Sequence, residues 1–165
     1  MKNLNFKSVF GILFLIGLFI VINKVDDKRI LMGITGILVV IFLFNFLVRK
    51  KPGFKSYFLS PFNLFSSKIT VKKSFDLSKD ILVPKFKEVL EAADFKIGYS
   101  DEAAGELFAY SNISWKSWGE NIYVDVNENG DVVFTSVAII GVYSWGKNEK
   151  NLEKLVETFE SSLII

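Results

Sequence analysis

Oxygen-bearing side chains stand at alternate positions in one short stretch of the chain, residues 125–131. This spacing matches the first half of an EF-hand loop, in which carboxylate and amide oxygens surround Ca²⁺. The match ends at the twelfth position, where Ser136 replaces the glutamate that binds the ion through both oxygens. Polar residues around Asn129-Gly130 are also typical of a tight hairpin. The sequence therefore predicts a hairpin turn here and no metal site.

Other catalytic chemistry has little support in this chain of 165 residues. It contains no His and no Cys, which excludes Ser-His-Asp triads, His-Cys zinc sites, thiolate nucleophiles and disulfides. Carboxylates gather at Asp101, Glu102 and Glu106, but this stretch is typical of a solvated turn. The net charge of +2 gives no basic footprint for nucleic acid. We therefore predict no catalytic residues, no cofactor, no nucleic-acid partner and no enzymatic activity.

Aromatic residues are concentrated in two predicted loops, at Trp115, Trp118, Tyr143 and Trp145. Two of these tryptophans precede a glycine in similar surroundings, Lys-Ser-Trp-Gly-Glu-Asn and Tyr-Ser-Trp-Gly-Lys-Asn. Exposing rings of this size to water is unfavourable. The four residues therefore either form a contact surface for a partner or a membrane, or cap the ends of a small core. The sequence leaves both interpretations open.

A second aromatic segment, residues 52–67, follows a basic cluster. Within it Phe54, Tyr57 and Phe58 share helical spacing. They are candidate contact residues if the segment lies on lipid headgroups. The alternative is a linker whose rings pack onto the domain that follows.

Two apolar stretches, residues 9–22 and 30–48, precede this segment and are separated by a few polar residues. A bilayer core is about 30 Å thick and needs about 20 apolar helical residues to cross it. The pattern predicts a two-helix transmembrane hairpin over residues 1–51. No small-x-small cleavage pattern follows residue 22, which argues against a cleaved signal peptide.

The orientation follows from Lys and Arg beside the spans. The short connection carries three of them, whereas the chain carries two before the first span and four soon after the second, at Arg49, Lys50, Lys51 and Lys55. This bias predicts a two-pass protein of the cell (inner) membrane with both termini in the cytoplasm.

Residues 68–165 are predicted to form a small α+β domain that buries a core without the hairpin. Apolar stripes predict a helix from Ser78 to about Ala93 and another that Asn148 caps. Pro84 predicts a kink or a later start in the first helix. Alternating residues predict strands, one before the first helix and four between the two helices, the third of the five spanning residues 107–115.

The order β-α-β-β-β-β-α predicts an antiparallel meander with both helices on one face. This order resembles that of TATA-binding-protein-like and helix-grip folds, over about 100 residues and without a shared motif. We expect a non-enzymatic, membrane-anchored interaction module that holds a protein partner or a second copy at the cytoplasmic face. The alternative is a module that binds an apolar ligand or lipid between the sheet and the last helix, which the apolarity of both faces of residues 107–115 favours.

Overall fold

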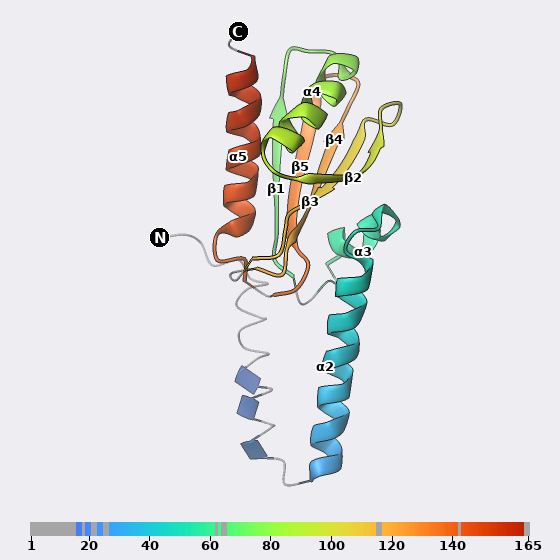
Figure 1. Cartoon of the computed structure of the whole chain (residues 1–165), viewed down its shortest axis with the longest axis vertical. Helices are drawn as coiled ribbons and strands as arrows, with labels where there is room; N and C mark the ends of the chain where they lie inside the picture. The colour runs from blue at the N-terminus through green and yellow to red at the C-terminus, as the bar shows by residue number, and fades with distance from the viewer. Residues whose placement is uncertain are drawn as a thin grey trace.

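The computed structural model describes residues 27–61, 63, 66–114, 117–141 and 143–163, together with residues 16, 17, 19, 20, 23 and 24. The first long helix, α2 (Lys28–Val48), runs away from the rest of the molecule (Figure 1). It begins after Asp27, whose carboxylate accepts a hydrogen bond from the Arg29 N–H at 2.8 Å. Within the described ranges, α2 is the one helix long and apolar enough to cross a membrane, with a mean hydropathy of 2.6.

Most of the first predicted span, residues 9–22, lies outside the described residues. The two-span hairpin therefore stays a prediction, and the described residues contain one candidate membrane span, α2.

The predicted element order β-α-β-β-β-β-α is confirmed for the rest of the chain. After α2 come η1 (Pro52–Phe54), α3 (Lys55–Leu59), β1 (Lys68–Ser74), α4 (Lys79–Ala92), β2 (Lys96–Asp101), β3 (Glu106–Tyr110), β4 (Glu120–Val126), β5 (Asp131–Ala138) and α5 (Lys147–Ser162). All neighbouring strands are antiparallel, in the spatial order β1-β5-β4-β3-β2. The last four strands form the predicted meander, and β1 lies beside β5 as an edge strand.

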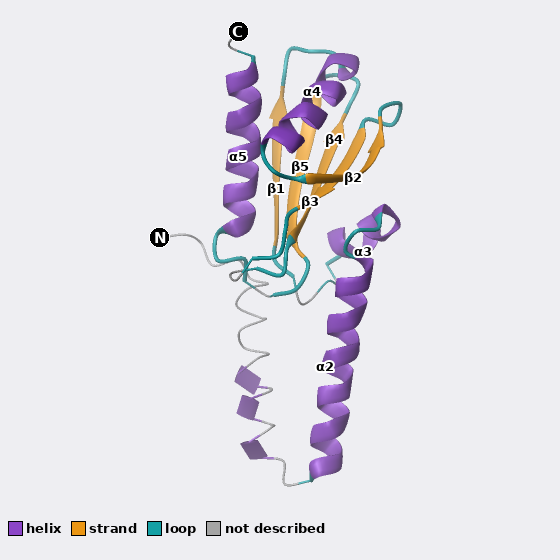
Figure 2. Ribbon diagram, in the orientation of Figure 1, coloured by secondary structure: helices purple, strands orange, loops and turns teal. Residues whose placement is uncertain are grey.

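Helices α4 and α5 cover one face of the sheet, as predicted (Figure 2). Side chains alternate along a strand, so β4 sends Ile122, Val124 and Val126 to this face. Opposite them, Phe86 of α4 and Phe159 of α5 stack with their ring centroids 4.2 Å apart, and both are fully buried. This first core therefore joins the two helices to each other and to the sheet.

The opposite face of the sheet has a core of its own. Phe108 of β3 and Tyr123 of β4 stack there at 5.1 Å. Phe58 of α3 and Val48 at the end of α2 are buried against this face. The aromatic segment therefore packs onto the domain, and the apolarity of both faces of β3 is explained by two cores.

Two sequence predictions of turns and caps are wrong in detail. Strand β3 ends at Tyr110 instead of residue 115. The Ser111 N–H still bonds to the Glu120 carbonyl at 2.9 Å, and a bridge between Ser114 and Ser117 then closes the loop. Asn148 does not cap α5, whose N-cap is Gly146 with φ 74°. Asn148 is buried instead and accepts a hydrogen bond from the Ser136 hydroxyl at 2.9 Å.

The expectation of a later start for α4 is also wrong, because the helix begins at Lys79 with Pro84 inside it. The proline ring removes the hydrogen bond that the Asp80 carbonyl would accept. Both residues are exposed, so water can satisfy that carbonyl at little cost. The Asn129-Gly130 hairpin is confirmed, with Gly130 at φ 82° between β4 and β5.

Candidate membrane-proximal site

The end of α2 is built into the α+β domain. Val48 is buried in the second core, and Arg49 directly follows it. The Arg49 guanidinium is also buried and donates a hydrogen bond from Nη1 to the Trp118 carbonyl at 2.9 Å. This bond joins the helix end to the loop between β3 and β4, so the domain is held at a defined position on α2.

Aromatic contacts extend this junction down the last two turns of α2. Phe42 meets Trp118 edge to face at 5.3 Å. On another side of the helix, Phe44 meets Tyr57 edge to face at 5.3 Å. The Tyr57 hydroxyl donates to the Asn45 amide oxygen at 3.2 Å. Asn45, the strongly polar residue of this apolar helix, is therefore satisfied at the junction.

A buried carboxylate lies just beyond the junction, at the start of β4. Glu120 is fully buried and accepts hydrogen bonds from the Ser111 hydroxyl at 2.5 Å, from the Ser117 hydroxyl, and from the Asn151 amide at 3.2 Å. The charge of Arg49 also acts on it. A buried carboxylate is costly unless it is hydrogen-bonded, and these bonds offset that cost. They also join the β3–β4 loop, through Ser111 and Ser117, to Asn151 of α5. This network has the character of a structural anchor more than of a catalytic acid.

Lys55 joins α3 to the second face of the sheet. Its ammonium binds Asp125 at 2.5 Å and Glu106 at 2.8 Å. Burial opposes the charge, but the bonds to Asp125 and Glu106 outweigh it and raise the pKa of Lys55 above its ordinary value of 10.5. The ion pairs of Lys55 therefore contribute their full stabilisation below pH 10.5, the ordinary pKa that lysine has in the unfolded chain. This contribution is lost as the pH rises through the higher pKa of the folded protein.

Replacing Lys55 with Met is expected to lower the free energy of unfolding by about 1 kcal/mol at neutral pH, since two partly exposed ion pairs disappear. The difference from the unmodified protein should shrink above pH 10.5, because Lys55 of the unfolded chain loses its proton there while the folded protein still holds it. Urea unfolding in detergent at pH 7 and pH 11 measures both values. Lys96→Met, which removes an exposed lysine from edge strand β2, is the control. Equal effects of the two variants would contradict a role for the Lys55 pairs.

Three of the predicted contact residues lie in two loops at the end of the sheet from which α2 extends. Trp118 lies in the β3–β4 loop, and Tyr143 and Trp145 lie in the β5–α5 loop with their rings 5.1 Å apart. Trp118 is 49% exposed and Trp145 is 76% exposed. Trp145 also has a left-handed backbone, at φ 50°, which is unfavourable for a bulky residue. The fold therefore holds a large ring in water at some conformational cost, which points to a contact.

The other predicted contact residues have different surroundings. Trp115 lies outside the described residues. Phe54 and Tyr57 are half-buried against Phe44 of α2. Phe58 is 1% exposed and has no surface to offer a partner, so its role is core packing.

The stretch that resembles half an EF-hand loop is a hairpin whose oxygens bind protein groups. Asp131 accepts hydrogen bonds from the Ser74 hydroxyl and the Asn129 amide, which hold the pKa of this carboxyl below its ordinary value. Asp125 points to the other side of the hairpin and binds Lys55. Among the described residues, no group of three or more acidic side chains could hold a metal ion.

The sequence does not identify four residues of the junction, Arg49, Lys55, Glu120 and Asn151. One signal was present, because Glu120 shares the alternation of Ile122 and Val124 and so belongs on the core face of its strand. The positive residues after the second span were assigned to orientation alone, and nothing in their spacing shows that one of them is buried.

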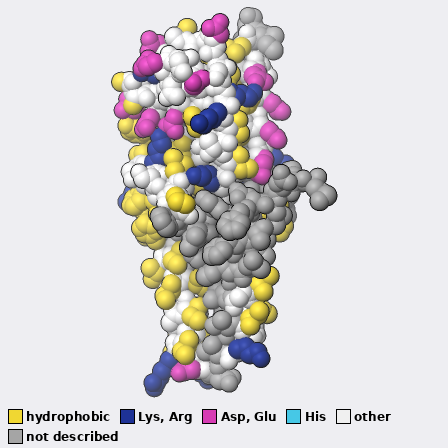
Figure 3. All heavy atoms as spheres, turned by 180° about the vertical axis from the view of Figure 1, so that it is seen from behind, with side chains coloured by type: hydrophobic (Ala, Val, Ile, Leu, Met, Phe, Trp, Pro, Cys, Tyr) yellow, Lys and Arg dark blue, Asp and Glu magenta, His cyan; other side chains and the backbone are white. Residues whose placement is uncertain are grey.

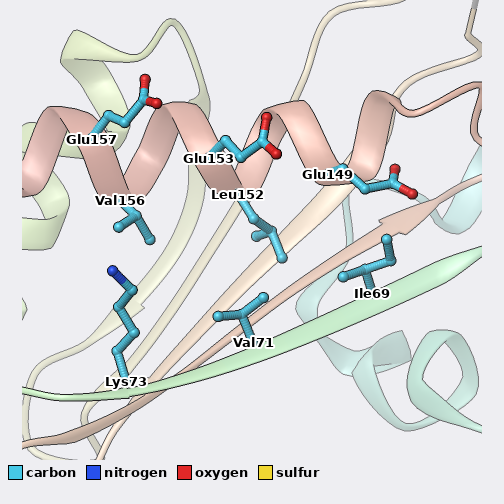
Figure 4. Close-up of a pocket in the computed structure, with 8 residues that line it drawn as sticks. All are labelled: Ile69, Val71, Lys73, Glu149, Leu152, Glu153, Val156 and Glu157. Atoms are coloured by element: carbon cyan, nitrogen blue, oxygen red, sulfur yellow. The ribbon is translucent and has the colours of Figure 1, made fainter. Parts of the chain in front are cut away.

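A groove of about 360 Å³ lies between β1 and α5 (Figure 4). Four aliphatic side chains form its floor, Ile69 and Val71 from β1 and Leu152 and Val156 from α5. Charged residues surround them, Lys73 on β1 and Glu149, Glu153 and Glu157 along α5.

No model of a known protein family matches this chain, and a comparison with curated proteins finds no match either. A function for the protein therefore has to come from the arrangement of its own residues.

Proposed function

We propose that this protein is a membrane-anchored interaction module, whose α+β domain is docked on the cytoplasmic membrane surface and presents a binding face to a protein partner. The observation that carries the proposal is the junction of Val48, Arg49 and Asn45 with the domain. A flexible tether would leave the domain free to rotate, whereas this junction holds the domain at one place on α2 and would give it one orientation to a membrane that α2 crosses.

The surface of α2 supports membrane insertion. Its apolar side chains are exposed along most of its length, and hydrophobic side chains mark this part of the molecule in Figure 3. Its 21 residues span about 32 Å as a helix, close to the thickness of a bilayer core. A cleaved signal sequence would take Val48 out of the second core, so the junction favours an anchor that is retained.

The exposed rings support docking at the membrane surface. Trp118 touches Phe42 in the last third of α2, near the end of the helix that leads out of the proposed span. Trp and Tyr are enriched at this depth, where their rings meet acyl chains and their polar atoms meet water. Trp118, Tyr143 and Trp145 are therefore proposed to rest in the headgroup region, with Lys50 and Lys51 beside them.

A second candidate function is the binding of an apolar ligand or lipid, and the groove between β1 and α5 favours it. The groove lies between the sheet and the last helix, with an aliphatic floor of suitable volume. Its three glutamates weaken the case for fatty acids and anionic phospholipids, whose own negative charge they would repel.

Labelling of single cysteines tests the anchor and its orientation. The chain has no Cys, so Asp27→Cys and Lys150→Cys each introduce a unique thiol. An acidic residue contributes little to orientation, which makes Asp27 a suitable position. In intact cells an impermeant thiol reagent should label position 27 and leave position 150 unlabelled until the cells are broken. The intact mass of the protein purified from the membrane fraction should show that residues 28–48 are retained.

Labelling of position 150 in intact cells would overturn the orientation. Recovery of a chain that lacks residues 28–48, or release of the full chain by alkaline carbonate, would overturn the membrane anchor itself.

A further inference from the structure

Strand β1 has an open edge. Its register with β5 is unbroken, and the Ser67 carbonyl and the Phe75 N–H both bond toward β5. Backbone groups alternate in direction along an antiparallel strand, so Thr70 and Lys72 direct their N–H and C=O groups away from β5. No other strand pairs with these groups in the part of the chain that the structure describes.

The groove lies directly above this edge. Ile69 and Val71 of β1 point toward Leu152 and Val156 of α5 (Figure 4). The two side chains of α5 are buried, whereas Ile69 and Val71 stay partly exposed. Strand β1 is therefore an edge whose unpaired backbone lies next to an unfilled apolar floor. An extended peptide that adds to a sheet edge can pair with the free backbone groups and fill the neighbouring groove with its side chains.

The acidic side of the groove has a regular spacing. Glu149, Glu153 and Glu157 follow one another at intervals of four residues along α5, which is about 6 Å on a helix. Alternate residues of an extended strand are about 6.6 Å apart. Within the described ranges no Lys or Arg is paired with any of the three glutamates, whereas Lys73 at the other side is bound to Glu160 at 2.6 Å.

We propose that the edge of β1 and the groove under α5 bind an extended peptide with Lys or Arg at alternate positions. Its backbone pairs with Thr70 and Lys72. Its basic side chains face α5, where their aliphatic stems cover Ile69 and Val71 and their cationic groups meet Glu153 and Glu157. This inference rests on the proposed function and names the class of partner that the module recognises.

A second copy of the chain is a less suitable occupant. The edge strands of two copies would bring Lys68 and Lys72 of both chains to the same face of the joined sheet, and like charges across neighbouring strands are destabilising. An apolar ligand is also less suitable, because it would leave Glu153 and Glu157 without a cationic partner.

The test uses the full chain in detergent and two labelled peptides of about nine residues each, a length that covers β1. In the first peptide Lys and Thr alternate, and in the second the same residues are grouped into a lysine block and a threonine block. Fluorescence anisotropy should show that the alternating peptide binds about tenfold more tightly, because only it can direct every lysine to α5 while its backbone pairs.

Two pairs of variants separate the glutamates from the backbone edge. Glu153→Gln with Glu157→Gln should weaken binding of the alternating peptide about fivefold. The control, Glu88→Gln with Glu91→Gln, removes the same charge from α4 and should leave binding unchanged. Lys72→Pro removes the outward N–H from an edge position that tolerates proline, and should weaken binding relative to Lys72→Thr, which keeps the N–H. Thermal unfolding shows that each variant is folded.

Equal affinity for the two peptides, or equal binding by Lys72→Pro and Lys72→Thr, would show non-specific charge attraction and overturn strand addition. An absence of binding, or a peptide-insensitive dimer that forms through β1, would also overturn the inference. In all of these cases a chain that stays in the membrane with residue 27 outside leaves the proposed anchor intact, so the two failures are distinguishable.

Discussion

A fragment that begins at Lys68 is expected to lose cooperative thermal unfolding, whereas a fragment that begins at Asn45 is expected to keep it. The shorter fragment lacks Val48 and Phe58, so it uncovers the second face of the sheet. Phe108, Tyr123, Val137 and Ile139 are buried on that face. Each such side chain contributes about 1.5–3 kcal/mol when buried, and their sum is comparable with the about 5–15 kcal/mol that stabilises a domain.

Calorimetry of the two fragments in mild detergent measures this difference. In the full chain, Phe58→Ala should destabilise the domain by about 3–5 kcal/mol, because the cavity would lie in the middle of the second core. Ser56→Ala changes an exposed residue of the same helix and serves as the control. A sharp, reversible transition in the Lys68 fragment at an unchanged temperature would contradict a structural role for the aromatic segment.

The strands and helices could be predicted from the sequence because each has a periodic signal. Alternation marks β4 and β5, and the stripe that includes Leu152, Leu155 and Phe159 marks α5. The Asn129-Gly130 pair then places the hairpin between the two strands. These local signals agree with one another, so the order β-α-β-β-β-β-α followed from them.

The second core could not be predicted, because an apolar strand face does not indicate which segment or molecule covers it. Leu107 and Phe108 show that both faces of β3 are apolar, which is equally consistent with a ligand, a second copy or another segment of the chain. Phe58 packs on this face of β3, although it lies about 50 residues before Phe108 in the sequence. Hydrophobic periodicity is a local signal and does not show which distant segments pack together. Independent folding of residues 68–165 stays a prediction, but that fragment would keep the first core and lose the Phe58 cover of the second.

The candidate site was predicted in part for a similar reason. Tryptophans in loops are visible in the sequence, but whether a ring is exposed depends on the backbone that carries it. Trp145, at φ 50°, and Gly146, at φ 74°, both have a left-handed backbone, and the Trp145 ring is 76% exposed. Arg49 was counted as one of several cations after the span, and its burial depends on the Trp118 carbonyl across the junction.

Phe159→Ala is expected to destabilise the domain by about 3–5 kcal/mol, because Phe159 is fully buried and its ring lies against Phe86 and Phe75 in the first core. Trp145→Ala should change the free energy of unfolding by less than about 0.5 kcal/mol, since the ring is mostly exposed and the substitution is at the surface. Urea unfolding of both variants in detergent measures the two effects.

The small effect expected for Trp145 carries functional meaning only if the ring meets lipid. A variant with Trp115→Phe and Trp118→Phe keeps Trp145 as the sole tryptophan. Its fluorescence should be quenched in vesicles whose acyl chains carry bromine near the headgroups, and not in unbrominated vesicles, because a ring in the interface lies within reach of those atoms. A stability loss for Trp145→Ala as large as that for Phe159→Ala would make the ring part of the core. Equal fluorescence in the two kinds of vesicle would instead place it in water, and the membrane-docked orientation of the domain would lose its support.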